Sequence, residues 1–341
     1  MLLEKLCNLS SVSGNEKEVR NFIYKEIEPY VDEIKIDFLG NLIATKKGKV
    51  GFPAIMLSAH MDEVGMMVKS IDENGFIKFL PVGGMDDRIF VSKIVEIGKN
   101  KIKGVIGAKA IHLQEPDERK SALKHKQLYI DIGAKSKEEA EKLISIGDYI
   151  HFDSKYIEFG NHLIKAKALD DRAGCAMIME LLKQEFNSTI YAVFSVQEEV
   201  GLRGAGVAAY RVNPDMALVL ETTTCYDVTG IDEPDFATSL GQGPALSLVD
   251  SGSYFDKNMV KKLLQIAEKH HIKVQFKQTT KGGNDAGRIH LTREGIPTST
   301  ISLPCRYLHS PISVIHKDDF ENTLKLVSLF LNSLNKEDDY E

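Results

Sequence analysis

The spacing of apolar residues changes several times along the chain, and each change predicts a different element. Between residues 19 and 27 the apolar side chains recur at helical spacing, and Pro29 ends the run. Ser13 and Glu16 precede this predicted helix with the spacing of a capping box. The segments that follow predict a hairpin at 34–38 and 41–45 and, at 54–59, a strand buried on both faces.

From about residue 64 to residue 168 the pattern consists of short strands separated by tight turns. The segments 66–71 and 76–80, for example, flank a Glu-Asn-Gly turn of the kind that joins two antiparallel strands. Only residues 136–143 have a helical pattern in this stretch. The block therefore predicts a small β-barrel.

After the β-rich block, helical and strand patterns alternate, which implies a largely parallel sheet with helices on both sides. We predict an α/β fold: a mixed, largely parallel sheet flanked by helices, with an inserted small β-barrel domain. Residues 1–66 and 167–341 are expected to form one discontinuous domain, and 67–166 the inserted one. The later elements expected are helices at 171–185, 255–269 and 317–335 and strands at 189–196, 217–220 and 296–303.

Composition places the chain among globular proteins and narrows its partners. Apolar residues make up 43% of the 341 residues and charged residues 27%, a balance that disfavours disorder. The net charge of −6 argues against a nucleic-acid partner. No run reaches the roughly 18 apolar residues of a membrane helix, and charges interrupt the N-terminus too early for a signal peptide. We expect neither nucleic acid nor a membrane as a partner.

The four cysteines are widely scattered and show no paired spacing. This pattern supports neither a disulfide framework nor a cysteine zinc site, so we expect reduced thiols and a cytoplasmic location. We find no internal repeat, and the one low-complexity stretch is the acidic run Glu337-Asp338-Asp339 near the end of the chain. The cysteines are Cys7, Cys175, Cys225 and Cys305.

The first candidate site follows the strand at 54–59, where the sequence reads His60-Met61-Asp62. Side chains two apart on an extended chain point to the same side, so the imidazole and the carboxylate can act together. His60 is a candidate metal ligand whose other ring nitrogen would donate to Asp62. Taken alone, the pair fits a hydrogen-bonded structural histidine better than a metal ligand.

The second candidate is the pair Asp170-Asp171, which opens the helix predicted at 171–185. One reading is N-capping, in which a carboxylate accepts hydrogen bonds from the free backbone amides of the first turn. The other reading is metal binding. Both hold if one aspartate caps and the other faces a metal.

Three further acids and one histidine also follow predicted strands, where open α/β sheets place their ligands. Glu198 and Glu199 end an apolar strand, and neighbouring like charges there are costly without a cation. Glu221 ends the strand at 217–220, and His309 lies between a strand end and a proline. Each alone also fits a polar loop.

Together, two histidines and at least three carboxylates suit a site for two divalent metals. Oxygen and imidazole ligands without thiolate fit zinc, cobalt or manganese. A metal pair about 3.5–4 Å apart polarises a carbonyl and acidifies a bridging water. A free carboxylate must then carry the proton, and one of Glu198 and Glu199 is available for that task.

These motifs, in this order, resemble the glutamyl aminopeptidase/tetrahedral aminopeptidase family of dinuclear metallopeptidases. The segments SAHMDE, ALDDRAG, QEEVGLRGA and RYLHSP carry the resemblance, which extends over essentially the whole chain, including the position of the inserted domain. The resemblance implies an aminopeptidase with two metal ions per subunit, zinc foremost and cobalt or manganese as alternatives. It also implies that the inserted domain supports oligomerisation, into dimers that build a dodecamer.

The resemblance implies a role for each candidate residue. Asp170 would bridge the two metals, and the peptide bond between Asp170 and Asp171 would be cis. Asp62 would orient His60, and Glu198 would be the general base. His60 and Glu221 would complete one metal site, and Glu199 and His309 the other.

Two departures from the family pattern bear on specificity. Glu221 stands where many relatives have aspartate, and glutamate at this ligand accompanies carboxypeptidases and deacylases in the wider group of dinuclear peptidases. Asn284 replaces threonine in the Gly-Gly-Thr-Asp segment, which here reads Gly282-Gly283-Asn284-Asp285 and is expected near the substrate cleft. A pocket for glutamyl residues needs a cation, for which Lys281, Arg288 and Arg306 are candidates.

We therefore expect hydrolysis of peptides at their N-terminal residue. A carboxypeptidase or a deacylase of N-acyl compounds is the first alternative, because of Glu221. A glycoside hydrolase, a label that some relatives carry, also uses two carboxylates but needs neither histidines nor metals. The last alternative is a non-enzymatic assembly scaffold.

Overall fold

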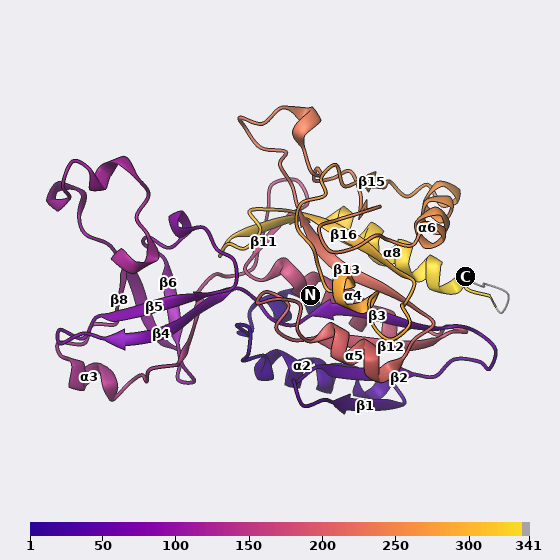
Figure 1. The fold of residues 1–341 in the computed structure, drawn as a ribbon, viewed down its shortest axis with the longest axis horizontal. Coiled ribbons are helices and arrows are strands. Elements are labelled where there is room, and N and C mark those ends of the chain that lie inside the picture. The colour runs from indigo at the N-terminus through magenta and orange to yellow at the C-terminus, as the bar shows by residue number, and fades with distance from the viewer. Residues whose placement is uncertain (336–341) are drawn as a thin grey trace.

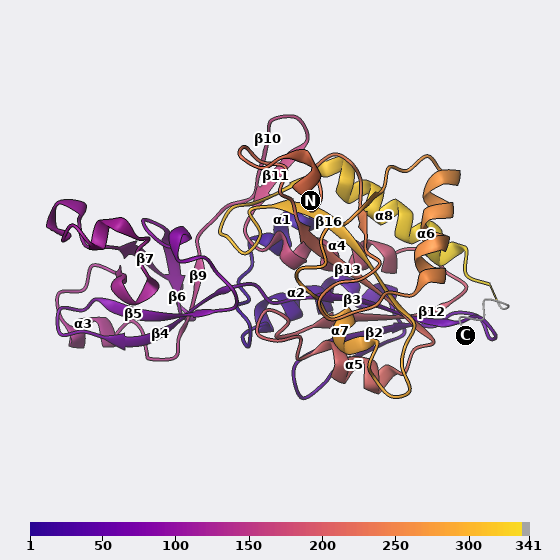
Figure 2. The same cartoon turned by 45° about the horizontal axis from the view of Figure 1, so that its top comes forward.

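The computed structural model describes residues 1–335, except for the side chain of Pro234. An α/β body carries a separate antiparallel barrel, which extends from one side of it (Figure 1). The same division is visible after a turn about the horizontal axis (Figure 2). The predicted fold class is confirmed.

One large mixed sheet runs through the α/β body. In order across the sheet, its strands are β1 (Glu33–Ile36), β2 (Leu42–Lys46), β12 (Thr189–Ser195), β3 (Ala54–His60), β13 (Met216–Thr224), β16 (Thr298–Arg306), β17 (Ser313–His316), β11 (Leu163–Ala166) and β10 (Ile157–Phe159). Two short strands, β14 (Ala245–Leu246) and β15 (Gln275–Phe276), extend it beside β16. The four central strands, β12, β3, β13 and β16, are parallel, so their carboxyl ends meet at one edge.

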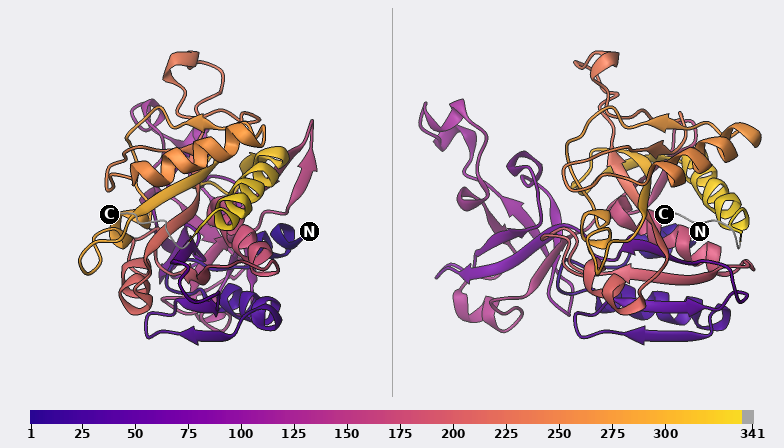
Figure 3. Two further views of the ribbon diagram at one scale, coloured as in Figure 1. Left: turned by 90° about the vertical axis from the view of Figure 1, so that its right-hand side faces the viewer. Right: turned by 45° about the vertical axis from the view of Figure 1, so that its right-hand side comes forward.

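Helices cover both faces of this sheet, as predicted. On one side α4 (Leu169–Leu182) packs on β3 and β13 and contacts α1 (Leu2–Cys7), α2 (Lys17–Ile27) and α8 (Lys317–Asn332). On the other side lie α5 (Ala205–Val212), which contacts β12 and β3, and α7 (Ala286–Ile289), which contacts β13 and β16 (Figure 3). The helix α6 (Lys257–Lys269) packs against α8 and β16. Covered on both faces, the central strands are buried along nearly their whole length.

The barrel closes through strands in the order β4 (Gly65–Ile71), β5 (Ile77–Val82), β8 (Tyr129–Asp131), β7 (Ile102–Gly107), β6 (Ile94–Ile97) and β9 (Tyr149–Phe152). The one α-helix of this region is α3 (Lys137–Glu141). The interior of the barrel is a separate hydrophobic core, in which Phe90, Ile130 and Ile150 are fully buried. Short 3-10 helices lie at Glu28–Tyr30, Asp87–Ile89, Ile111–Leu113, Glu118–Lys120, His125–Gln127 and Glu233–Asp235.

The chain leaves the α/β body at the end of β3 and returns to it before α4. Strands β10 and β11 follow the barrel in sequence, but they pair with β17 and so belong to the large sheet. The hydrogen-bonded strands of the barrel therefore run from Gly65 to Phe152. The division into domains at residues 66 and 166 stays a proposal.

The predicted capping box at the second helix is wrong. Helix α2 begins at Lys17, and its N-cap residue, Glu16, makes no side-chain cap. Ser13 instead donates a hydrogen bond to Asp62, and Glu16 accepts one from the amide of Gly14. A partner 49 residues away, which the local pattern does not contain, outweighs the local cap.

Three further expectations from the sequence can be compared with the structure. The four cysteines are free and buried. Among residues 1–335 no helix combines the length and the apolar character needed to cross a bilayer. The acidic run Glu337-Asp338-Asp339 lies outside the described residues.

Candidate metal centre

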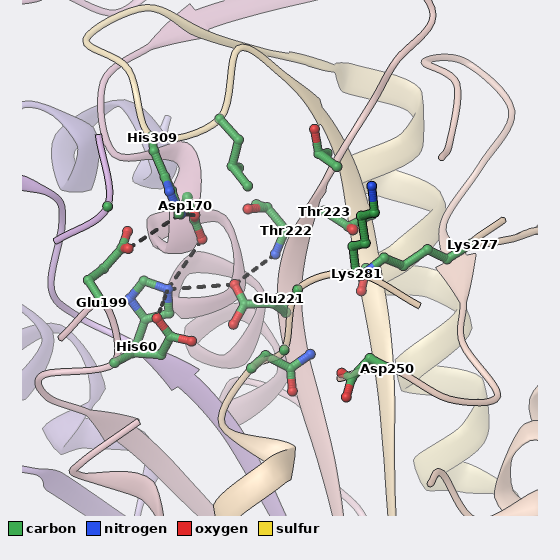
Figure 4. A pocket seen from close by; sticks show the side chains of 18 of the residues that line it. His60, Asp170, Glu199, Glu221, Thr222, Thr223, Asp250, Lys277, Lys281 and His309 are labelled. Atoms are coloured by element: carbon green, nitrogen blue, oxygen red, sulfur yellow. Dashed lines mark hydrogen bonds and ion pairs between the residues drawn. The ribbon is translucent and has the colours of Figure 1, made fainter. Parts of the chain in front are cut away.

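The candidate ligands gather where the parallel strands of the large sheet end (Figure 4). His60 is the last residue of β3, and Glu221 lies in the second half of β13. The remaining residues come from the loop after β12, the start of α4 and the loop after β16; they are Glu198, Glu199, Asp170 and His309.

The carboxylate of Asp170 lies between two imidazoles that come from opposite ends of the chain. Its Oδ1 is 3.2 Å from Nε2 of His60, and its Oδ2 is 3.4 Å from Nε2 of His309. One carboxylate with one oxygen directed to each histidine has the arrangement of a bridging ligand. Asp170 therefore joins the two histidines into one cluster of possible metal ligands.

A second carboxylate completes each half of the cluster. Oε1 of Glu221 lies 3.6 Å from Nε2 of His60, and Oε2 of Glu199 lies 3.3 Å from Nε2 of His309. Ligand atoms of His60, Asp170 and Glu199 all lie within 4.8 Å of one another. All five residues expected to bind metal are therefore brought together.

Asp171, the neighbour of the bridging residue, faces the backbone instead. Its Oδ1 accepts a hydrogen bond of 2.9 Å from the amide of Gly174, as an N-cap does, and its Oδ2 lies 3.3 Å from the amide of His60. The capping interpretation therefore fits Asp171, while metal binding by Asp170 stays a prediction. The peptide bond between Asp170 and Asp171 is cis, as the resemblance implied.

Asp62 binds the loop after β12 more closely than it binds His60. Its carboxylate accepts hydrogen bonds of 3.0 and 3.2 Å from the amides of Glu198 and Glu199 and one of 2.6 Å from Ser13. Nδ1 of His60 lies 3.0 Å from the backbone oxygen of Asp62 and 3.5 Å from its carboxylate. Asp62 thus fixes both acids of the loop, a role that the sequence did not suggest.

Glu198 lines the cavity without a close side-chain partner. Its Oε2 lies 4.0 Å from Nε2 of His60, and its side chain is 11% exposed. Burial raises the pKa of Glu198 well above its usual value, and the charges of Glu221 and Asp285 raise it further, although His60 opposes them. A buried acid beside the candidate ligands is suited to proton transfer.

The cluster holds more negative charge than its histidines balance. Burial, reinforced by Asp170, raises the pKa of Glu199 to about 8 and that of Glu221 to about 7. Burial alone would also raise the pKa of Asp170, but hydrogen bonds from His309 and His60 hold it below its ordinary value. A bound cation would stabilise the ionised form of these buried acids. Carboxylate and imidazole donors without thiolate fit zinc, cobalt or manganese.

A cavity of about 290 Å³ opens in front of the cluster. Across from His60 and Asp170 it is lined by Lys277, Lys281 and Asp250 (Figure 4). Gly282, Gly283 and Asn284 also line it, as expected for this segment, and the buried carboxylate of Asp285 accepts a hydrogen bond from Ser195 below the cluster.

Of the three cations expected in the pocket, only Lys281 lines this cavity. Arg306 is paired with Asp227 at 2.8 Å, and Arg288 lines a separate surface cavity beside α5. The missed cation is Lys277, which follows β15 and is half-buried. No local signal marks it, because β15 has only two residues and pairs with a distant strand.

Comparison with known proteins finds similar sequences over almost the whole chain. A model of the M42 glutamyl aminopeptidase family matches residues 40–326. The glutamyl aminopeptidase of Lactococcus lactis is 34% identical over 347 residues, which cover 98% of this chain and 96% of the relative.

Solved structures agree as well. An aminopeptidase from the archaeon Desulfurococcus kamchatkensis superposes with a TM-score of 0.94 at 36% identity, covering 98% of this chain and 95% of the other. The TET1 peptidase of Pyrococcus horikoshii, which can assemble into a tetrahedron or a large octahedral shell, has a TM-score of 0.86 at 33% identity, with 98% and 99% covered.

Proposed function

The chain belongs to the M42 glutamyl aminopeptidase family and is a metal-dependent aminopeptidase, and from that premise we propose that two divalent cations bind around Asp170. The observation that carries the proposal is the Asp170 carboxylate, with one oxygen 3.2 Å from His60 and the other 3.4 Å from His309. His60 and Glu221 would hold one cation, and Glu199 and His309 the other. Zinc fits this donor set best, with cobalt and manganese as alternatives.

When bound, such a cation pair would acidify a water molecule and polarise the scissile carbonyl. The chain supplies the proton transfer. Glu198 lines the cavity beside His60 with a raised pKa, so it would take the proton of the attacking water and deliver it to the leaving nitrogen. Asp62 would hold Glu198 in place through the backbone amide.

The substrate side of the cavity favours a negatively charged side chain. The half-buried ammonium of Lys277 lines the cavity, and within residues 1–335 it has no hydrogen bond or ion pair. Burial lowers the pKa of Lys277, although the charges of Asp250 and Glu221 oppose this shift. Lys277 lies where it would face a bound substrate. We propose that it receives the carboxylate of an acidic N-terminal residue.

Aminoacyl anilides test the substrate preference, because they carry no C-terminal carboxylate. Glutamyl anilide should be cleaved with a higher kcat/KM than glutaminyl or lysyl anilide, and Lys277→Met should remove that difference. Lys281→Met, at an exposed position of the same rim, is the matched control and should change it less. An unchanged ranking in Lys277→Met rejects this role for Lys277.

A deacylase or carboxypeptidase is the second candidate, favoured by the glutamate at position 221, whose carboxylate accepts a hydrogen bond from the amide of Thr222 and lies 3.6 Å from His60. Peptides with free and with acetylated N-termini separate the two functions. Cleavage of the free peptides supports the aminopeptidase, and preference for the acetylated ones rejects it. Hydrolysis of a glycoside that survives a chelator would favour a glycoside hydrolase. A chain with no hydrolytic activity at all would favour a non-enzymatic scaffold.

We also propose that the chain forms a homo-oligomer. The support is the assembly of the P. horikoshii TET1 peptidase, which aligns over 98% of this chain. The finer proposal is a dimer that builds a dodecamer, with the inserted domain at 67–166 as its oligomerisation module. A cytoplasmic location is proposed on the four free cysteines.

A further inference from the structure

A cluster of buried charges lies behind the candidate ligands and is used by no step of the proposed reaction. Glu63 and Lys167 are each 4% exposed, and Arg172 is fully buried. Charged residues are almost never buried to this extent unless they are paired. The cluster therefore needs a functional or structural explanation.

Glu63 is the centre of this cluster. Both oxygens of its carboxylate lie within hydrogen-bond distance of the ammonium of Lys167, at 2.7 and 2.8 Å. Oε1 also accepts hydrogen bonds from the guanidinium of Arg172 at 3.2 Å and from the amide of Ser11 at 3.0 Å. One carboxylate thus joins three segments that are far apart in the sequence.

The two cations extend the connection to backbone oxygens. Arg172 donates to Met61 at 3.0 Å and to Leu6 at 2.7 Å, and Lys167 donates to Leu9 at 2.6 Å. Met61 directly follows His60, so the guanidinium holds the backbone beside a candidate ligand. Leu6 and Leu9 belong to the N-terminal segment, so this segment is also bound to the cluster.

The position of the cluster in the sequence relates it to the metal centre. Glu63 follows Asp62, at the point where the chain leaves for the barrel, and Lys167 lies in the short connection between β11 and α4. Lys167 and Arg172 stand on either side of Asp170 in the sequence. The cluster therefore ties the segment that carries His60 to the segment that carries Asp170.

We propose that Glu63, Lys167 and Arg172 are positioning residues that set the spacing between His60 and Asp170, and hence the geometry of the metal pair. This inference rests on the proposed metal centre. Glu63 and Lys167 line the same narrow cavity as three of the candidate ligands, Asp170, Glu199 and His309. The cluster acts through the backbone, because none of its charges contacts a ligand side chain.

The proposed positioning role differs from a contribution to the stability of the fold, because it depends on directional hydrogen bonds. Buried ion pairs stabilise a fold no better than well-packed apolar residues of the same volume, whereas a carboxylate that binds several donors fixes their relative positions. Substitution of a residue that orients a metal ligand typically lowers metal affinity or activity by about 10–100-fold. The test must therefore measure ligand geometry and not only folding.

The experiment uses the full chain loaded with Co²⁺, whose visible absorption bands report ligand geometry. Glu63→Gln keeps the shape of the side chain but removes its charge, and should bind Co²⁺ at least tenfold more weakly with altered bands. At saturating Co²⁺ its kcat should fall while KM for an aminoacyl anilide changes little. Glu180→Gln, in a surface ion pair with Lys183 at the end of α4, the helix that carries Arg172, is the matched control and should behave as the wild type.

A double variant, Glu63→Gln with Lys167→Met, removes one charge of each sign and tests whether charge balance alone matters. Its thermal stability should recover relative to Glu63→Gln while its cobalt bands stay altered. Wild-type bands in folded Glu63→Gln, or their return in the double variant, reject the inference. Failure of both variants to fold also rejects it, because the cluster then serves stability. If the wild type itself binds no cobalt, it is the proposed metal centre that fails.

Discussion

At the scale of single residues, two adjacent aspartates perform different tasks. Asp170 directs its two oxygens to two histidines, while Asp171 accepts hydrogen bonds from the amides of Gly174 and His60. The sequence alone predicts both tasks for the pair but does not assign them. The assignment depends on contacts with His60 and His309, which lie more than 100 residues away on either side.

Glu198 provides the residue-scale test of the proposed reaction. Glu198→Gln preserves the size of the side chain but cannot accept the proton, so turnover should fall by about 10²–10⁴-fold. The metal content should stay unchanged, because Glu198 is outside the proposed ligand set. Elemental analysis and steady-state kinetics measure the two quantities. Full activity in this variant would remove Glu198 from the mechanism.

Metal binding should depend on pH with a definite sign. In the absence of metal, burial raises the pKa of Glu199 to about 8 and that of Glu221 to about 7, so both carry protons below these values. A cation must displace those protons, so its affinity should rise with pH up to about 8 and fall as the pH drops below 7. Titration calorimetry in buffers of different ionisation enthalpy counts the released protons. Binding without proton release would contradict the account.

At the scale of elements, the parallel strands explain why the site was predictable. Three apolar strands end in or near His60, Glu198 and Glu221, and parallel pairing brings these ends to one edge of the sheet. The pattern therefore located the candidate site. It did not locate Lys277, which follows a strand of only two residues, or the hydrogen bond between Ser13 and Asp62, because both depend on distant partners.

Helix α4 offers a stability test at this scale. Exchange of glycine for alanine inside a helix normally stabilises it by about 1 kcal/mol. At Gly174, however, an added Cβ would lie 2.5 Å from the backbone oxygen of Leu220 and 2.5 Å from the Asp171 carboxylate. Gly174→Ala should therefore lower the unfolding temperature and weaken metal binding.

Gly206→Ala on α5 is the matched control for Gly174→Ala. There the nearest atom is the Cβ of Arg288, at 3.3 Å, which leaves room for a small adjustment. Thermal unfolding of both variants should show a clearly larger loss for Gly174→Ala. Equal stability of the two variants would mean that α4 need not approach β13 so closely.

At the scale of the whole molecule, the barrel has no role in the proposed chemistry of the α/β body. It has its own core and leaves apolar side chains on its outside; Ile94 and Val105, paired across β6 and β7, are 50% and 48% exposed. Exposed apolar surface of this kind marks sites of association. Sedimentation at micromolar concentration should therefore give a mass that is a multiple of 38.0 kDa. A monomer would reject the proposed assembly.

The central claim is that Asp170 bridges two divalent cations, and anomalous diffraction from zinc-loaded crystals tests it most directly. The account predicts two anomalous peaks per chain, one among His60, Asp170 and Glu221 and the other among Asp170, Glu199 and His309. Peaks placed elsewhere, or a single peak that leaves His309 without a cation at saturating zinc, would contradict it.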